Sequence, residues 1–416
     1  MSTKKHPAWR MLLAGCLLVG GGQGILVNCQ GIFITSVCTA NGFSTGAFTT
    51  YTSVSSIAMM VAMIFAGNAV KKFPFRPLLI ICSILSCGLF MSYALYSQLW
   101  CWYVVGILYS IFMSIPFYMA GPMLITNWFV KKQGFAMGIM MAMTGIFGAI
   151  FNIVGGSIIA SSGYKMAYVV LGAVALIMEL IGSSLAIAHP AIKGLKAYGA
   201  DEAEVVAAQN APQAEETGVP ASVALKSPAF YLTYIALFLF IFMACFAQML
   251  PTFGSSLGYD ITTASSLSSF YMIGTLIGSF VFGALNDKIG AKSATIMSMA
   301  LLGIGAVGAV FVGKIMIALA VCIVVMGFAG AAGGTQPAVL PSKLFGKKDY
   351  ASIYGKVQTS AALSAMVAMP VYGLIYDLTN SLTLGLFGGA ALCVIAIICV
   401  IGAFNSASKL SKEYIK

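Results

Sequence analysis

The stretch "GALNDKIGAK", residues 283–292, is a short charged segment inside a long apolar region. Asp287, Lys288 and Lys292 lie within it, and almost uncharged runs precede and follow it. Each run is long enough for a transmembrane helix, which needs about 20 mostly apolar residues. The stretch is therefore predicted to be a turn at a membrane surface that joins two transmembrane helices.

The whole chain has the composition of a membrane protein. Of its 416 residues, 60% are hydrophobic and only 8% are charged, whereas soluble proteins carry about 25% charged residues. Backbone groups in hydrocarbon must be hydrogen-bonded within the protein, so long apolar runs are expected to be helices. We therefore predict an all-α membrane protein with twelve transmembrane helices. The expected spans are 10–35, 46–70, 77–98, 101–127, 134–160, 165–188, 229–254, 262–286, 293–313, 315–341, 351–376 and 382–405.

The formal net charge of +11 raises the question of a nucleic-acid partner, but the positions of the charges argue against one. With the N-terminus in the cytoplasm, only Lys165 and Lys314 of the 22 Lys and Arg residues fall on the outer side. Such an excess of basic residues on one side is typical of cytoplasmic loops. We expect a multi-pass monomer in a plasma membrane, such as the cytoplasmic membrane of a bacterium, with both termini in the cytoplasm.

The longest polar segment, residues 189–227, divides the chain into two halves. It contains five of the eleven acidic residues and three prolines, a composition that favours a partly disordered linker with a short helix near 201–209. The expected domains are a six-helix half at 1–188, a cytoplasmic linker at 189–227 and a second six-helix half at 228–416.

The two halves repeat each other at an offset of 216 residues. The turn "GNAVKKFPFR" (67–76) aligns with 283–292, with Lys71 in place of Asp287. At the same offset "WFVKKQGFA" (128–136) aligns with "LFGKKDYAS" (344–352). Two motifs that repeat at one offset indicate a duplication of the whole half.

The charged turn resembles a loop signature of the major facilitator superfamily. In this sequence it reads Gly283-x-x-x-Asp287-Lys288-x-Gly290-x-Lys292, and the span count and duplication extend the resemblance over the whole chain. The resemblance implies a transporter whose halves are related by pseudo-two-fold symmetry, with a substrate site between them at mid-membrane.

Three further stretches resemble the branch of oxalate/formate antiporters and monocarboxylate transporters. They are "GIF" (31–33), "GFSTGAF" (42–48) and "NWFVKKQGFAMG" (127–138). This resemblance implies a small organic anion as substrate, held by basic side chains in spans eight and eleven. Span eleven contains Lys356, whereas span eight has no basic residue before Lys288 at its end.

Neutral polar residues in the spans expected to line the cavity are candidate substrate ligands. Amides and phenols can hydrogen-bond a carboxylate or hydroxyl, although they also form interhelical bonds worth about 0.6 kcal/mol each. The predicted ligands are Gln23, Tyr51, Tyr118, Asn152, Tyr271 and Gln336, and Gln248 is a further polar residue of these spans.

Two ionisable residues lie inside predicted spans. Lys356 is expected to attract the substrate anion, or alternatively to extend its amine to the membrane surface. Glu179 in span six is either a proton site or a neutral structural carboxyl.

Four charged residues are expected to form a cytoplasmic gate. By the repeat, Asp287 should approach the start of span five beside Lys131, and Lys71 the start of span eleven beside Asp349. A carboxylate near a helix N-terminus is favourable. We predict that both contacts hold the gate shut when the protein faces outward.

No enzyme motif, metal-ligand spacing or cofactor motif is visible in the sequence. We expect a secondary active or facilitative transporter of a small organic anion, a monocarboxylate or related acid, that works by alternating access without a cofactor. An exporter of amphipathic organic compounds is one alternative, and a membrane receptor or enzyme is another.

Overall fold

The structure is a computed structural model that describes residues 6–129, 133–199, 218–346 and 350–414. Within these ranges the regular structure is helical, apart from two isolated β-bridges, Phe129–Tyr198 and Gly218–Gly346. The helix predicted near 201–209 lies outside the described residues.

The helices of the first half match its predicted spans, and several spans are interrupted. Span one consists of α1 (Ala8–Val19), the π-helix η1 (Gly20–Val27), the short 3₁₀-helix η2 (Gln30–Ile32) and α2 (Phe33–Asn41). The next elements are α3 (Thr45–Lys72), α4 (Phe75–Ser92), η3 (Tyr93–Leu95), α5 (Leu99–Met113), the π-helix η4 (Ser114–Ala120), α6 (Gly121–Trp128) and α7 (Gln133–Leu185). Helix α7 is broken at Gly163, whose φ is 81°, between predicted spans five and six.

The linker and the second half continue the series. The linker contains η5 (Pro190–Lys193) and α9 (Ala221–Ala224). The following elements are α10 (Pro228–Ala244), the 3₁₀-helix η6 (Cys245–Met249), α11 (Leu250–Ser256), α12 (Ile261–Lys288), α13 (Ala291–Phe311), α14 (Met316–Gly330), α15 (Ala332–Phe345), α16 (Tyr350–Thr379) and α17 (Thr383–Tyr414).

Ten helical stretches among the described residues are long and apolar enough to cross a membrane. One of them, Phe135–Leu185, covers both predicted spans five and six. The two spans are joined directly at Gly163, with no loop between their helices. Helix α3, in which not every residue is fully described, is not among the ten. Its 28 residues are nevertheless about 42 Å long at 1.5 Å per residue, which exceeds the bilayer core of about 30 Å.

The helices form two compact units, and the boundaries between them cut through two helices. Unit 1 contains Met1–Phe43, Val54–Ala211 and Asp260–Ser269, and unit 2 contains Ser44–Ser53, Pro212–Tyr259 and Phe270–Lys416. The start of α3 therefore packs in unit 2 and the start of α12 packs in unit 1. These two exchanged segments lie 216 residues apart, the offset of the sequence repeat.

In unit 1, α7 packs against α1, η1 and α4. A buried core surrounds Trp128 and Phe129, and the linker residue Tyr198 packs against it. The N–H of Tyr198 donates to the carbonyl of Trp128 at 2.8 Å. The first part of the linker is thereby attached to the junction between spans four and five.

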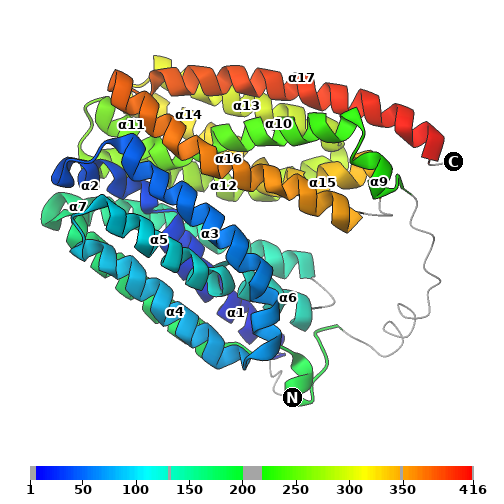
Figure 1. Cartoon of the computed structure of the whole chain (residues 1–416), viewed down its shortest axis with the longest axis horizontal. Helices are drawn as coiled ribbons and strands as arrows, with labels where there is room; N and C mark the ends of the chain where they lie inside the picture. Colours follow the sequence, from blue (N-terminus) through cyan, green and yellow to red (C-terminus); the bar gives the residue numbers. More distant parts are fainter. Residues whose placement is uncertain (1–5, 130–132, 200–217, 347–349, 415–416) are drawn as a thin grey trace. The chain divides into compact units, whose positions relative to one another are not determined.

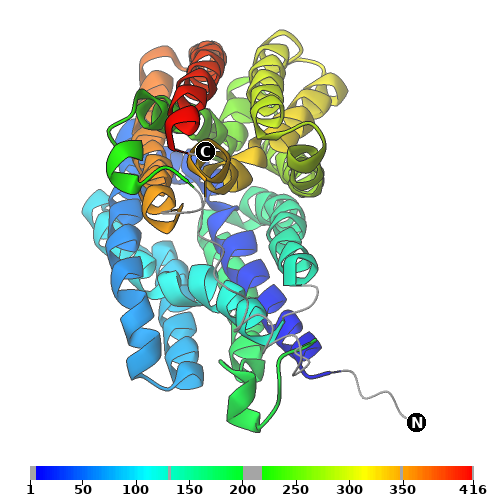
Figure 2. The same cartoon turned by 90° about the vertical axis from the view of Figure 1, so that its right-hand side faces the viewer.

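In unit 2, α17 packs against α10 and α13, as both views show (Figures 1 and 2). The end of the linker is attached here in an equivalent way, because the N–H of Val219 donates to the carbonyl of Phe345 at 2.8 Å. Phe345 is the repeat equivalent of Phe129. Each end of the linker therefore contacts the same junction of its own half.

Glycines allow a very close crossing of α12 and α14 in unit 2. A Cβ on Gly274 would lie 2.1 Å from the carbonyl oxygen of Val324, and one on Gly278 would lie 2.2 Å from that of Phe328. On the facing helix, a Cβ on Gly327 would lie 2.0 Å from the carbonyl oxygen of Tyr271. Small residues spaced in this way let transmembrane helices approach to backbone contact.

Candidate functional site

Spans one, four, seven and ten each have an irregular segment along their length, and span three ends in the short 3₁₀-helix η3. The irregular segments of the four spans are η1 in span one, η4 in span four, η6 in span seven and the break at Ala331 between α14 and α15 in span ten. They occupy the first and fourth spans of each sequence half. Interrupted helices in transporters expose backbone groups and polar side chains to substrate, and π-helical turns are frequently found at functional sites.

In unit 1, the two π-helical segments contact each other through a predicted ligand. Gln23 in η1 donates from Nε2 to the carbonyl of Phe117 in η4 at 2.8 Å. The contact is close, because a Cβ on Gly22 would lie 2.3 Å from the Phe117 ring. Tyr118, also in η4, is half-buried. The sequence signals for this irregularity are the run Gly20–Gly22 and the proline within η4.

Asn152, another predicted ligand in unit 1, is buried in α7. Its Nδ2 donates to the carbonyl of Gly148 at 2.7 Å and lies 3.5 Å from that of Asn28, while its Oδ1 has no hydrogen-bond partner. The unpaired oxygen is an acceptor, so it can bind a ligand that donates a hydrogen bond, such as a hydroxyl or a protonated acid.

In unit 2, Tyr271 and Gln336 take part in separate contacts. The Tyr271 hydroxyl lies 3.5 Å from the carbonyl of Ala244, in hydrogen-bonding range. The buried Gln336 donates from Nε2 to Oδ1 of Asn286 at 3.1 Å, and its own Oε1 has no partner. Asn286 was not singled out by the sequence analysis. It is a polar residue next to Asp287 in the last turn of α12, a position that first suggests a helix end rather than a ligand.

Tyr51 and Lys356 also belong to unit 2. Tyr51 is buried at the start of α3, with its ring 5.0 Å from that of Phe48. Lys356 lies in the second turn of α16, and its side chain is exposed. Gln248 in η6 is half-buried.

Three of the four irregular segments thus carry an amide or phenol, and Gln336 follows the fourth by five residues.

The predicted gate cannot be described at the level of side chains. Lys131 and Asp349 lie outside the described residues, and only the backbones of Lys71 and Asp287 are described, at the ends of α3 and α12. The gate therefore stays a prediction from the sequence.

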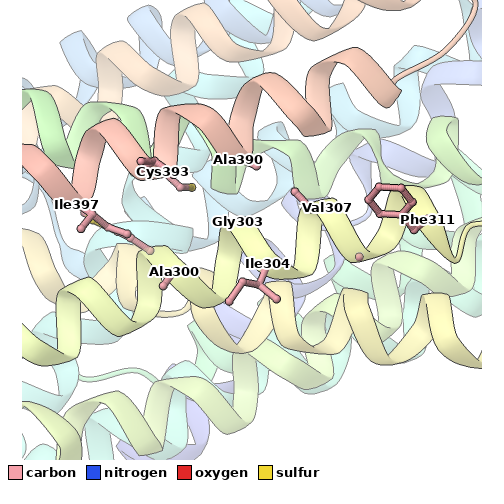
Figure 3. A pocket seen from close by; sticks show the side chains of 11 residues that line it. Ala300, Gly303, Ile304, Val307, Phe311, Ala390, Cys393 and Ile397 are labelled. Carbon is pink, nitrogen blue, oxygen red and sulfur yellow. The ribbon is translucent and has the colours of Figure 1, made fainter.

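Unit 2 also contains an apolar cavity of about 550 Å³ between α13 and α17. Figure 3 shows Gly303, Ile304 and Val307 on α13 and Ala390 and Cys393 on α17 around it. None of the predicted ligands lines this cavity, and its apolar walls offer no group that would hold an anion. Within the described ranges, no cluster of His, Cys, Asp and Glu could hold a metal ion.

Sequence comparison identifies relatives of this chain. Residues 39–267 and 245–413 match the profile of a family described as Major Facilitator Superfamily. The protein "MFS-type transporter pytF" of Aspergillus terreus (strain NIH 2624 / FGSC A1156) is 24% identical over 168 residues, which are 40% of this chain and 50% of that protein. The matched region thus spans about half the length of this relative.

Solved structures share the fold at low sequence identity. A D-xylose-proton symporter has a TM-score of 0.72 at 12% identity, over 96% of this chain and 97% of that one. The nucleoside transporter NupG has a TM-score of 0.68 at 14% identity, over 97% and 100%. A bacterial homologue of the human lysosomal transporter Spinster has a TM-score of 0.66 at 14% identity, over 100% of both chains.

Proposed function

Because the chain belongs to the major facilitator superfamily, a family of membrane transporters rather than enzymes, we propose that it moves a small organic anion across a membrane by alternating access. The proposed substrate class is a monocarboxylate or a related organic acid. The proposed orientation places both termini in the cytoplasm of a bacterial cell, as the distribution of Lys and Arg favours.

The observation that carries this proposal is the set of irregular segments in spans one, four, seven and ten. The regular α-helical pattern of backbone hydrogen bonds changes in η1, η4 and η6, and Ala331 separates α14 from α15. Gln23, Tyr118, Gln248 and Gln336 lie in or near these segments, and each can hydrogen-bond a carboxylate or hydroxyl. These spans are therefore suited to recognise a small polar molecule.

An anionic substrate is favoured by Lys356. An anion moved out of water without a compensating cation has a large desolvation cost. Lys356 lies six residues after the start of α16, about 9 Å along the helix axis. Its side chain is exposed and would offset the charge of a carboxylate that approaches α16. The oxygens of Asn152 and Gln336 without partners would accept hydrogen bonds from a hydroxyl of the same substrate.

The gate is part of the proposal. Asp287 with the start of span five, and Lys71 with the start of span eleven, would close the cytoplasmic side through contacts between a charge and a helix terminus. Lys131 and Asp349 would complete these contacts.

The test is transport by purified protein in liposomes. Labelled lactate, formate and oxalate are the anionic probes, and xylose and the dye ethidium are a neutral and an amphipathic control. We expect saturable uptake of at least one carboxylate that unlabelled carboxylate inhibits, with none in protein-free liposomes. Saturable movement of ethidium without uptake of any carboxylate would contradict the proposal and identify an exporter of amphipathic compounds.

A further inference from the structure

Glu179, in the second part of α7, is a carboxyl group without a hydrogen-bond partner in the interior of unit 1. Its side chain is fully buried, and neither carboxyl oxygen is hydrogen-bonded. It lies six residues before the end of the apolar stretch Phe135–Leu185, about 9 Å along the helix axis. Charged side chains at such depth are costly, and in membrane proteins they are associated with ion and proton pathways.

The surroundings of Glu179 are polar, and among the described residues no cation lies beside it that would stabilise a carboxylate. Ser83 of α4 lies beside it, and the hydroxyl oxygens of Ser83 and Ser183 are 3.5 Å apart. The titratable groups that face it are the thiols of Cys82 and Cys87 and the phenol of Tyr109. Thiols and phenols are ordinarily uncharged near neutral pH. Burial of an unpaired carboxylate here would be very unfavourable, so this arrangement suits the neutral acid.

The neutral acid is also poorly paired, because the Ser83 hydroxyl that interacts with it does not reach hydrogen-bonding geometry with either carboxyl oxygen. A buried donor without an acceptor costs about 1–3 kcal/mol, and such groups often have a functional explanation. An apolar side chain would avoid this cost. The carboxyl therefore fits a group whose hydrogen bonds are formed in another conformation of the transporter.

Glu179 packs directly against the π-helix η1, which carries a proposed substrate ligand. A Cβ on Gly21 would lie 3.4 Å from Cγ of Glu179 and 3.3 Å from the carbonyl oxygen of Ala175. The glycine thus allows the stem of Glu179 to lie against η1. Two residues further along, Gln23 is held by its hydrogen bond to Phe117. Any rearrangement of η1 around Glu179 would therefore move Gln23.

We propose that Glu179 takes up and releases a proton during the transport cycle, and that this couples substrate movement to a proton gradient. In the conformation described, the carboxyl is the neutral acid. When water reaches it, the O–H bond breaks, its electron pair stays on the carboxylate and the proton passes to water as hydronium. The carboxylate then requires hydrogen-bond donors, so the residues around η1 repack and Gln23 shifts. This proposal rests on the transport function proposed above.

The first experiment measures the proton directly and needs no substrate. Infrared difference spectra of the purified protein in liposomes are recorded over a pH series, in H₂O and in D₂O. We expect a carbonyl band of a protonated carboxylic acid that disappears as the pH rises, shifts in D₂O and is missing in Glu179→Gln. Asp260→Asn, which changes a carboxyl outside the spans, should keep the band. A Glu179 band that does not change at any pH at which the protein stays folded would overturn the proposal.

The second experiment measures coupling. Uptake of labelled lactate, formate and oxalate is compared with and without an inward proton gradient, beside exchange at equal pH. In the wild type and in Asp260→Asn, the gradient should stimulate uptake of the transported probe. In Glu179→Gln, which mimics the neutral acid, the stimulation should be lost while exchange stays within about twofold of the wild type. Stimulation that persists in Glu179→Gln, or that follows a sodium gradient instead, would overturn the proposal.

The two experiments separate failure of this proposal from failure of the proposed function. If the wild type transports no carboxylate probe, the organic-anion function is contradicted, and the infrared titration still decides whether Glu179 exchanges a proton. If exchange is also lost in Glu179→Gln, the unfolding temperature of that variant shows whether it has a folding defect. Glu179→Asp, which keeps the carboxyl group, is then tested in its place. Restored gradient stimulation in Glu179→Asp supports the proposal, whereas a correctly folded Glu179→Asp with exchange but no stimulation opposes it.

Discussion

The backbone N–H of Gly46 donates a 2.7 Å hydrogen bond to Oδ2 of Asp377, a residue 331 positions further along the chain. The other carboxylate oxygen, Oδ1, accepts a 2.8 Å bond from the N–H of Thr45. The two helices cross closely, since a Cβ on Gly373 would lie 2.7 Å from Cα of Gly46. Asp377 of α16 thus caps the first turn of α3, where a carboxylate is favourable for both its hydrogen bonds and its charge.

The repeat equivalent of this crossing lies in unit 1 and lacks the carboxylate. There, the start of α12 packs on α7, and Ser269 donates to the carbonyl of Ala149 at 2.6 Å. At the start of α12, Asp260 caps its own helix by accepting a 3.1 Å bond from the N–H of Thr263. The hydroxyl and the N–H of Thr263 hold the pKa of Asp260 below its usual range. The two crossings therefore differ in which helix supplies the cap.

Replacement of Asp377 should loosen the start of α3. Asp377→Ala removes two hydrogen bonds to the first turn, and loss of such a cap costs about 1 kcal/mol. This corresponds to about fivefold faster local opening. Hydrogen exchange followed by mass spectrometry should show faster exchange in a peptide that contains Thr45 and Gly46.

Asp260→Ala is the matched control for that change. It should speed exchange at Thr263 and leave Thr45 and Gly46 unchanged. Equal exchange at Thr45 and Gly46 in the wild type and in Asp377→Ala would mean that the cap contributes nothing measurable.

Addition of one methyl group at the crossing of α12 and α14 should destabilise the protein. In Gly278→Ala, the new Cβ would meet the carbonyl oxygen of Phe328, which is backbone and cannot rotate away. Overpacking of this kind costs about 1–3 kcal/mol. Thermal unfolding followed by tryptophan fluorescence should show a lower midpoint.

Gly88→Ala should have the opposite effect in the same assay. No heavy atom lies within 4 Å of a Cβ built on Gly88 in α4, and alanine favours a helix over glycine by about 0.5–1 kcal/mol. An equal decrease of the midpoint in both variants would refute the close crossing of α12 and α14.

Lys356→Gln should weaken the binding of an anionic substrate and leave a neutral ligand unaffected. Loss of the positive charge is expected to raise the dissociation constant for a carboxylate about tenfold, which equals about 1.4 kcal/mol. Calorimetry on the carboxylate identified by transport, beside a neutral amide of the same acid, measures the difference. Lys314→Gln, which removes a lysine between α13 and α14, should change neither value. Unchanged carboxylate affinity in Lys356→Gln would remove this residue from the site.

The predicted topology can be tested by labelling of single cysteines. In a variant whose ten native cysteines are replaced, Ser222→Cys and Lys314→Cys introduce thiols at two exposed positions. An impermeant maleimide added to intact cells should label Lys314→Cys, and it should label Ser222→Cys only after the cells are opened. The reverse pattern would invert the proposed orientation.

The membrane spans could be predicted from the sequence because hydrophobicity is summed over each local stretch. Most helix bounds agree with the expected spans to within a few residues, although span one continues to Asn41 and the helix of span twelve continues to Tyr414. The boundary between spans five and six falls at Gly163. Helix α3 was predicted as the apolar stretch 46–70, and the repeat aligns the turn after it with the turn after α12. The fold class and the family resemblance therefore followed from composition, the charged turn at 283–292 and two motifs that repeat at one offset.

The candidate site could be predicted only in part. Polar residues inside apolar spans are visible in the sequence, so Gln23, Asn152 and Gln336 could be selected. Their partners could not, because the contacts with Phe117, Gly148 and Asn286 depend on helix rotation and on irregular turns. The π-helical form of η1 also depends on packing, since glycines permit many backbone conformations and neighbouring helices select one.

By itself, the sequence determined the all-helical membrane fold, its duplication and the presence of an ionisable residue in span six. Only the tertiary structure decided that Glu179 is fully buried without a hydrogen-bond partner and that Asp377 caps a helix 331 residues away. The reason is physical. Transfer of a residue into a membrane depends mainly on its own chemistry, whereas burial, hydrogen bonding and capping depend on which distant groups the packed helices bring within 3 Å or so of it.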